Sequence, residues 1–376
     1  MRGTGTVPSI RKRPSGNYEA RYRDPKGRSR GKTFATRAEA RRFLAEIEHA
    51  LVDRAYRDPA LGRVRFAEYA QWWLANRPEL RPRTQELYEG LLRIHIVPTF
   101  GEVRFDQLTS PLVRSWHASL TSAPRPGPVT VAKAYRLLRT ILNDAVDDGL
   151  LVKNPCSIRG AGVERSPERP IATLEQVDAL AEAIEPRYRA MVLLATFCGL
   201  RLGELLALRR DRIDLGKARV LVVEQVVELH DGTRTVGPPK TAAGRRTVAI
   251  PPHIVGDLEA HLSAFVGIDP DSLVFPAPDG GFVRKSNFHR RVWGPATARV
   301  GMAGFHFHDL RHTGNTLAAS TGASTKELMA RMGHASARAA LIYQHATESR
   351  DVAIAQALSE LATGNGRDGR SDQRAR

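Results

Sequence analysis

The sequence predicts a multidomain chain. A small α+β domain (a three-stranded sheet plus one helix) comes first, an all-α domain follows, and a mostly α-helical domain with a small antiparallel sheet comes last. Large and polar residues alternate near the N-terminus, apolar residues recur at helical spacing from about residue 66 to 146, and strand-like patterns return at 218–250 between helices. A length of 376 residues suits two or three domains.

The expected domain boundaries are 1–55, 62–155 and 166–362. The stretches 52–62 and 154–170 contain proline, glycine and charge, which is typical of linkers. The tail at 363–376 is rich in Gly, Arg, Asp and Ser and has little apolar surface to bury. We therefore expect it to be disordered.

In the first domain, turn signals at 14–16 and 24–27 flank residues 17–23, where large and polar side chains alternate at period two. Thr36 and Glu39 have the spacing of a helix-capping box. Four apolar residues form one stripe on the helix that follows: Phe43, Leu44, Ile47 and Leu51. A three-stranded sheet packed against this helix is expected.

The second domain is expected to contain four helices. The first carries an apolar stripe of Phe66, Tyr69, Trp72 and Trp73. The second covers residues 84–95, and the fourth covers 129–146. Ser110 is expected to cap the third helix, with a proline at its first helical position. The stripes are more typical of a helical core than of a surface that stacks on bases.

The third domain is expected to begin at Thr173, which forms a capping box with Gln176. Helices are predicted at 187–197 and 204–208. Strands are predicted at 218–229 and 245–250, with a hairpin turn at 230–232. Further helices are predicted at 252–265, 286–300, 308–320, 324–332, 336–343 and 348–361. Cys198 ends an apolar run and is expected to be a buried core thiol.

The charge of the chain points to a polyanionic partner. The formal net charge is +17, and residues 1–60 contain 15 lysines and arginines against 7 acidic residues. Arginine, the prevalent cation, suits two-pronged phosphate contacts, although a GC-rich genome gives the same bias. The candidate DNA contacts in the first two domains are Arg11, Arg13, Arg21, Arg23, Arg28, Arg30, Arg81, Arg83, Lys133 and Arg136.

Several functional classes are disfavoured by what the sequence lacks. Two cysteines without a C-x-x-C pair exclude a disulfide framework or a zinc knuckle as the organising device. There is no phosphate loop of the G-x-x-x-x-G-K type, which disfavours nucleotide hydrolysis. No signal peptide or membrane-spanning run is visible. We expect a cytoplasmic protein without a cofactor, a metal ion or a membrane partner.

The segment 305–345 contains the most informative spacing. His308 and Arg311 stand three residues apart, His334 follows Gly333, and Tyr343 comes nine residues after His334. Arg201, in Cys-Gly-Leu-Arg-Leu-Gly, supplies a second guanidinium upstream. Each residue alone is more typical of a core or surface position. Their joint occurrence in one domain of a very basic chain indicates chemistry on a DNA phosphate.

Attack on a phosphodiester requires a nucleophile, stabilisation of growing negative charge and a proton for the leaving oxygen. Two guanidiniums can grip the non-bridging oxygens, and the phenol of Tyr343 is a candidate nucleophile. Lys240, on an inter-strand loop, is a candidate general acid. His308 and His334 can hydrogen-bond the phosphate or move protons. Glu204, one helical turn after Arg201, can orient a cation. No carboxylate cluster typical of two-metal catalysis is apparent.

These residues resemble the tyrosine recombinases, and among them the phage-type integrases. The resemblance rests on Thr-x-Cys-Gly-Leu-Arg-x-Gly-Glu, on His-Asp-Leu-Arg-His-Thr, and on Met-Gly-His with a tyrosine nine residues later. It covers about 62–361, and residues 1–60 resemble the arm-type DNA-binding domain of many such integrases. The family's catalytic set falls on Arg201, Lys240, His308, Arg311, His334 and Tyr343, with Glu204 at the accompanying acidic position.

The resemblance implies a site-specific recombinase in which the second (core-binding) and third (catalytic) domains enclose double-stranded DNA. Four protomers would bring two core sites together, and each tyrosine would form a 3′-phosphotyrosyl intermediate during integration and excision of a phage or mobile element. Residues 1–60 would bind separate arm sites. A host DNA-bending factor and a directionality factor are candidate further partners.

Three alternatives remain open at this point. A type IB topoisomerase uses very similar chemistry. A host Xer-like chromosome-dimer resolvase is closer still, but the basic N-terminal domain and the greater length favour an integrase. A DNA-binding regulator with a vestigial catalytic set belongs to another class, which the intact set disfavours.

Overall fold

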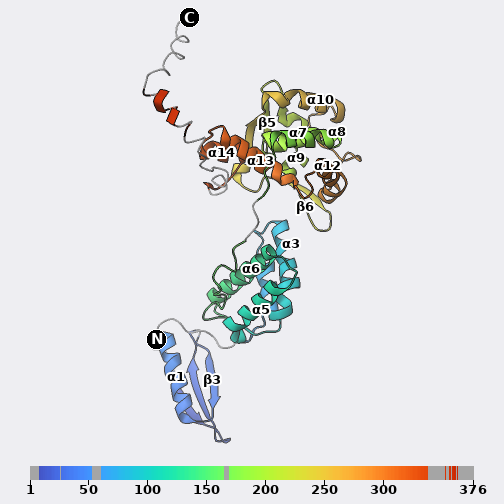
Figure 1. Cartoon of the computed structure of the whole chain (residues 1–376). Coiled ribbons are helices and arrows are strands. Elements are labelled where there is room, and N and C mark those ends of the chain that lie inside the picture. Colours follow the sequence, from blue (N-terminus) through green and yellow to red (C-terminus); the bar gives the residue numbers. More distant parts are fainter. Residues whose placement is uncertain are drawn as a thin grey trace, which may run out of the picture. The chain divides into compact units, whose positions relative to one another are not determined.

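The computed structural model describes residues 8–25, 27–52, 61–164 and 169–337, together with 352, 355, 356, 358–360 and 362. The chain divides into two compact units, 1–166 and 167–376, whose elements are labelled in Figure 1. Most of the helices expected at 336–343 and 348–361, and the tail at 363–376, lie outside the described residues. Within these limits, none of the helices has the length and apolar character required to span a bilayer.

The first unit begins with an antiparallel sheet in the order β1-β2-β3 (Ser9–Lys12, Tyr18–Arg23 and Ser29–Phe34). The helix α1 (Arg37–Val52) packs against it. Thr36 and Glu39 form the expected capping box, with their reciprocal backbone hydrogen bonds at 3.1 and 3.2 Å. The buried core is small and consists of Ala20, Tyr22, Ala40 and Leu44. The predicted sheet and helix are confirmed.

Two acidic residues of this sheet hold several of the arginines predicted to contact DNA. Glu19 accepts from Arg13 at 2.9 Å and lies 3.2 Å from Arg21. Asp24 lies 2.9 Å from Arg28 and 3.3 Å from Arg30. Both acids are buried, so the ion pairs restrain these four guanidiniums on the strands and at the turns that join them.

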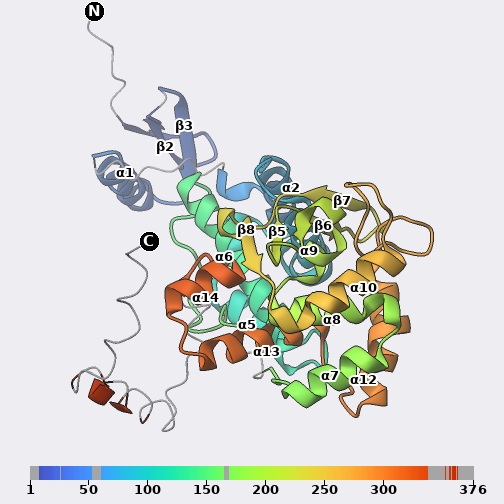
Figure 2. The same cartoon turned by 90° about the horizontal axis from the view of Figure 1, so that it is seen from above.

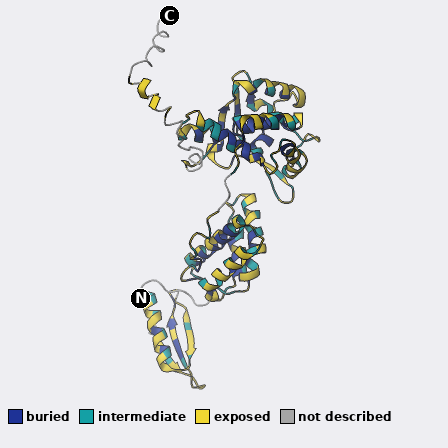
Figure 3. Ribbon diagram, viewed as in Figure 1, coloured by how far each residue is buried: buried dark blue, intermediate teal, exposed yellow. Residues whose placement is uncertain are grey.

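The rest of the first unit is helical. Its α-helices are α2 (Phe66–Ala75), α3 (Pro82–Leu91), α4 (Val97–Phe100), α5 (Ser110–Ser122) and α6 (Pro128–Asp147). A π-helical turn, η2 (Leu92–Ile96), joins α3 to α4, and 3₁₀ turns lie at η1 (Leu61–Arg63) and η3 (Phe105–Gln107). The apolar faces of α2, α5 and α6 meet in one core, seen as dark blue segments in Figure 3.

Two details of this region differ from the sequence-based expectations. The N-cap of α5 is Thr109, whose hydroxyl accepts from the backbone amide of Leu112 at 3.5 Å, whereas Ser110 is the first helical residue. Ser110 instead donates to the carbonyl of Pro155 at 3.0 Å. Trp72 is 54% exposed and does not belong to the core, because Trp73 takes the inward position on α2.

The second unit is mostly helical, with helices before and after the strands in its sequence. These are α7 (Leu174–Ala183), α8 (Pro186–Phe197), α9 (Leu202–Leu206), α10 (Val255–Phe265), α11 (Lys285–Asn287), α12 (Gly294–Arg299), α13 (Phe307–Ser320) and α14 (Thr325–Met332). A π-helical turn, η7 (Phe288–Trp293), joins α11 to α12, and 3₁₀ turns are η4 (Arg210–Arg212), η5 (Ala242–Gly244) and η6 (Pro252–Ile254). The predicted capping box of Thr173 and Gln176 is present.

Helix α8 lies at the centre of this unit. It packs against α7, α10 and α13 (Figures 1 and 2). Residues on nearly every face of this helix are buried, including Met191, Leu194 and Ala195. Cys198, at its C-terminal end, is fully buried as expected, and burial raises the pKa of its thiol to about 12. The helix therefore holds a fixed position for the turn that follows it.

The strands of this unit form two small antiparallel sheets. One has the order β4-β5-β8 (Ile213–Asp214, Arg219–Val222 and Arg246–Ala249), and the other pairs β6 (Gln225–Glu228) with β7 (Arg234–Gly237). The single strand expected over 218–229 was wrong, because the chain leaves the first sheet after Val222 and enters the second at Gln225. The hairpin turn and the strand before residue 250 are confirmed.

Candidate active site

Three segments that are distant in the sequence meet around the predicted catalytic arginines. The Arg311 guanidinium, on α13, donates to the carbonyls of Gly199 and Met332. The Arg201 guanidinium lies 3.4 Å from the carbonyl of Gly333. His334 follows that glycine directly. The structure therefore brings the two arginines and this histidine together, as the sequence predicted.

The turn before Arg201 requires glycine. Gly199 has a φ of +63°, and a Cβ placed there would lie 2.2 Å from the Met332 sulfur. A side chain at this position would therefore meet both backbone strain and a steric clash. This close approach connects the end of α8 to the end of α14, and the hydrogen bond that Gly199 accepts from Arg311 adds α13.

Glu204 is the buried anion of the site. Arg201 is the N-cap of α9, and its backbone amide and guanidinium donate to the Glu204 carboxylate at 2.9 and 2.7 Å. The sequence analysis expected Glu204 to orient a cation, and in the structure Arg201 is one cation that it holds. Glu204 is only 2% exposed, so its charge needs close cationic partners.

A second arginine, Arg246 on β8, completes this cluster and was missed by the sequence analysis. Its guanidinium donates to the two Glu204 oxygens at 2.9 and 3.2 Å, and also to the carbonyls of Arg331, Gly244 and Gly199. It is 8% exposed. Period-two alternation along β8 could have found it, since this position shares the inward face with Val248.

The two arginines decide the protonation of the shared carboxylate. Burial alone would raise the pKa of Glu204, but hydrogen bonds and charge from Arg246, and then from Arg201, lower that pKa below its ordinary value. A group with a lowered pKa in the folded state stabilises the fold above its unfolded pKa. This contribution is lost as the pH falls below about 4.5.

We expect Arg246→Gln to destabilise the fold by about 3 kcal/mol near pH 7, since it leaves a buried carboxylate with one cation fewer. The difference from the wild type should shrink as the pH falls and Glu204 protonates. Urea denaturation at several pH values measures both effects. Arg212→Gln, which removes a half-exposed arginine of the same unit, is the control and should change stability little. Equal losses in both variants would contradict the expectation.

The histidines of the site are neutral at pH 7. Loss of hydration and the charges of Arg311, Arg201 and Arg246 lower the pKa of His334 to about 4. Burial, followed by the charges of His312, Arg311 and Arg201, also lowers the pKa of His308. The rings of His308 and His312 pack edge to face, with their centroids 4.9 Å apart. Neutral imidazoles can both donate and accept a hydrogen bond.

Lys240 lies on the loop between β7 and β8, as predicted, and its side chain is exposed. The same loop reaches the site further along: a Cβ on Gly333 would lie 2.8 Å from the carbonyl oxygen of Ala243. The loop that carries the lysine thus adjoins the backbone next to His334. The predicted role of Lys240 as a general acid stays a prediction.

Tyr343 lies outside the described residues, so its predicted role also stays a prediction. The continuously described part of this unit ends at Ala337, three residues after His334. In the described parts, no group of three or more His, Cys, Asp and Glu side chains has an arrangement that could hold a metal ion.

The predicted DNA contacts of the helical region are spread over two helices. Arg81 is the N-cap of α3, and Arg83 pairs with Glu86 at 2.9 Å. Lys133 and Arg136 lie on α6, where Arg136 pairs with Glu164. Their contact with DNA stays a prediction, as it does for the arginines of the N-terminal sheet.

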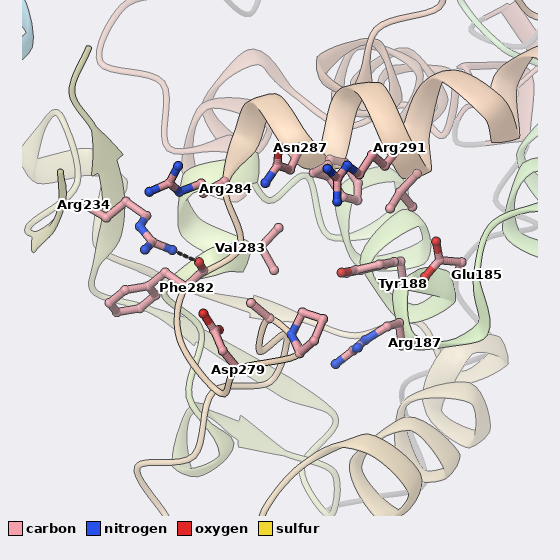
Figure 4. A pocket seen from close by; sticks show the side chains of 14 residues that line it. Glu185, Arg187, Tyr188, Arg234, Asp279, Phe282, Val283, Arg284, Asn287 and Arg291 are labelled. Carbon is pink, nitrogen blue, oxygen red and sulfur yellow. Dashed lines mark hydrogen bonds between the residues drawn. The ribbon is translucent and has the colours of Figure 1, made fainter. Parts of the chain in front are cut away.

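A basic cavity of about 540 Å³ lies in the second unit, away from the predicted catalytic arginines (Figure 4). Arg284, the N-cap residue of α11, lines it together with Asn287 of α11 and Arg291 of η7, and Arg187 and Arg234 line it from α8 and β7. The last two are fixed by the carbonyls of Pro276 and Phe282. The described residues provide no ion-pair partner for Arg284 or Arg291. The cavity wall also carries the carboxylates of Glu185 and Asp279.

Comparison with known proteins decides the family. The phage integrase family model matches residues 171–350, the phage integrase N-terminal domain matches 8–54, and the phage integrase N-terminal SAM-like domain matches 65–121. The chain is 38% identical to the prophage phiRv2 integrase of Mycobacterium tuberculosis, over 94% of this chain and 95% of that protein. The chain belongs to the phage integrase family. It is a site-specific recombinase of the tyrosine class, as the resemblance implied.

Solved integrase structures share its fold. The Tn1549 transposon integrase, in complex with a circular intermediate DNA, superposes with a TM-score of 0.67 at 18% identity, covering 78% of this chain and 98% of that one. Lambda integrase, as a tetramer bound to a Holliday junction, superposes with a TM-score of 0.55 at 17% identity, covering 88% and 96%. Family membership favours an integrase over the resolvase and the vestigial regulator.

Proposed function

We propose that this phage integrase family member cuts and rejoins DNA through a 3′-phosphotyrosyl ester formed by Tyr343, and thereby integrates and excises a phage or mobile element. The observation that carries the proposal is the meeting of Arg201, Arg311 and His334 around the backbone at 199–201 and 332–334. Tyr343 comes nine residues after His334 in the sequence.

The two guanidiniums supply charge that is present at any working pH. Each carries five N–H donors in a rigid fork, so a guanidinium can hold a backbone carbonyl and phosphate oxygens at the same time. Arg201 and Arg311 would bind the non-bridging oxygens of the phosphodiester and stabilise the extra charge that develops on attack. Glu204 and the carbonyls of 199, 332 and 333 hold these cations in place before DNA arrives.

In this proposal the neutral imidazoles of His308 and His334 and the exposed ammonium of Lys240 transfer the protons. A neutral imidazole can accept the phenolic proton or donate to a phosphate oxygen, and His308 and His334 are both neutral at pH 7. Lys240 would protonate the leaving 5′ oxygen. The ester then preserves the energy of the broken bond, so the freed 5′ hydroxyl of a partner duplex can restore a phosphodiester without ATP.

The proposal includes double-stranded DNA as the partner and four protomers on two duplexes. The Tn1549 integrase is bound to DNA and lambda integrase is a tetramer on a Holliday junction in their structures. We assign arm-site binding to 1–55, core-site binding to 62–155 and catalysis to 166–362. A DNA-bending host factor and a directionality factor would assist. The reaction would take place in the cytoplasm of a bacterial host, on its nucleoid.

Tyr343→Phe should abolish covalent attachment to DNA, because it removes the phenolic oxygen that is proposed to attack the phosphate. The assay uses a nicked duplex that spans one junction between the integrated element and its host chromosome, and it detects the covalent complex in a denaturing gel. Wild-type protein should trap the DNA by its 3′ end. Tyr188→Phe, which changes a buried tyrosine of the same unit, should retain attachment. A 3′-linked complex with Tyr343→Phe would refute the assignment.

The basic cavity is proposed to bind DNA phosphates. Arg284→Gln with Arg291→Gln should reduce the slope of log affinity against log salt concentration by about 0.9 for each phosphate that these arginines neutralise in the wild type. Fluorescence anisotropy with the junction duplex measures the slope, and cleavage at saturating DNA should persist. Arg299→Gln, an exposed arginine of α12, is the matched control. An unchanged slope in the double variant would count against phosphate binding by this cavity.

The N-terminal domain is proposed to bind arm sites that are separate from the core site. Deletion of residues 1–55 should abolish gel shifts of DNA fragments that carry only the arm sites, because the sheet and its arginines are removed. Covalent attachment to the nicked core-site duplex should remain. If arm-site shifts survive the deletion, this domain has another role.

A further inference from the structure

The segment 169–172, at the start of the second unit, is fastened to the helix that carries His308 and Arg311. The Arg169 guanidinium donates through two nitrogens to the two oxygens of Asp309, at 2.8 and 2.5 Å. Three residues further on, the backbone amide of Ala172 donates to the Thr313 hydroxyl at 3.0 Å. Asp309 and Thr313 are 1% and 0% exposed. These two contacts, whose partners on α13 are both buried and stand one turn apart, thus hold the segment along that helix.

Asp309 also fixes the beginning of α13 itself. Its carboxylate accepts the backbone amide of His306, the N-cap residue, at 2.7 Å. The same anion therefore holds the N-cap and the distant Arg169. His308 and Arg311 lie within the first five residues of this helix. A shift of its first turn would move both side chains relative to the carbonyls of 199 and 332 that hold Arg311.

We propose that Arg169 is a positioning residue for recombination, which acts through Asp309 to set the first turn of α13 and thereby the placement of His308 and Arg311. This inference rests on the proposed function of those two residues. Arg169 makes no contact with the phosphate in this role. The residue belongs instead to the chain segment that follows directly on the boundary between the two units at 166–167, where the sequence analysis expected a linker.

The two hydrogen bonds between Arg169 and Asp309 explain why this ion pair can fix the orientation of the carboxylate and not only its distance. Two parallel N–H···O bonds fix the plane of a carboxylate, whereas a single lysine ammonium fixes only a distance. With its plane fixed, Asp309 can direct an oxygen at the His306 amide. Removal of the guanidinium would leave a buried carboxylate free to reorient toward other donors, and the first turn would follow it.

The experiment compares full-length Arg169→Gln with wild type on the nicked junction duplex. We expect duplex affinity to be retained, while the rate of covalent attachment at saturating DNA falls by about 100-fold, the reduction typical of a misplacement of about 1 Å. Arg189→Gln is the matched control. It removes an arginine of similar exposure from a 2.8 Å ion pair with Asp257 in the same unit, on helices other than α13. This control should keep its attachment rate.

Further variants separate positioning from stability. Arg169→Lys keeps the charge but lacks the second hydrogen bond, so its attachment rate should lie between those of wild type and Arg169→Gln. The double variant Arg169→Gln with Asp309→Asn removes the unpaired charge. It should recover thermal stability without recovering the rate, because the carboxylate that fixed the first turn is gone. Recovery of rate and stability together would show a purely structural role and overturn the proposal.

The controls also distinguish this inference from the proposed function. If wild type forms no covalent complex, the proposed chemistry fails and Arg169 is irrelevant to it. If wild type forms the complex and Arg169→Gln does so at the same rate, the chemistry stands and the positioning role is refuted.

Discussion

A buried carboxylate that binds an arginine from elsewhere in the chain is the interaction on which this site depends. Glu204 accepts the backbone amide of Arg201, the N-cap of α9, and binds Arg246 from β8. Since Glu204 is almost fully buried, its charge would be costly without those cations. The cations in turn cannot move away without leaving that charge unpaired. The arginine proposed to bind phosphate is therefore positioned by a carboxylate that is almost fully buried.

Much of this arrangement could be predicted from the sequence because the relevant signals are local. The capping boxes at Thr36 and Thr173 and the alternation in residues 17–23 depend on neighbours a few residues away, and the structure confirms them. The helical stripes are local signals too; they predicted the helix at Phe66–Ala75 but wrongly placed Trp72 in the core. The three-residue spacing of Arg201 and Glu204 likewise indicated that Glu204 can orient a cation, although Arg201 is the N-cap of α9 and does not lie within the helix. The convergence of Arg201, Arg311 and His334 was predicted from the chemistry that these residue types can perform together. No local sequence pattern indicates that they meet.

The features that escaped prediction depend on contacts between distant segments. Alternation along β8 places Arg246 on the inward face, but nothing near it in the sequence indicates that its guanidinium meets Glu204, which lies 42 residues away. Arg169 appeared to be the charged end of a linker, because its partner follows 140 residues later. The single strand expected at 218–229 failed for a related reason. β-Branched residues favour strands throughout that stretch, but whether the chain stays in one sheet depends on which partner strand is available.

The two buried acids share one design. Glu204 and Asp309 each occupy the third position of a helix, accept the backbone amide of its N-cap residue and bind an arginine from a remote segment. The helices they begin are those that display Arg201 and Arg311. A helix start is where unpaired backbone amides favour an anion, so an acid there is already oriented before its arginine arrives. Each proposed phosphate-binding guanidinium thus depends on a second guanidinium that neutralises the local anion. In the proposed phosphate site, positive charge would be gathered by burying negative charge behind it, so that the cations repel one another less and keep one geometry.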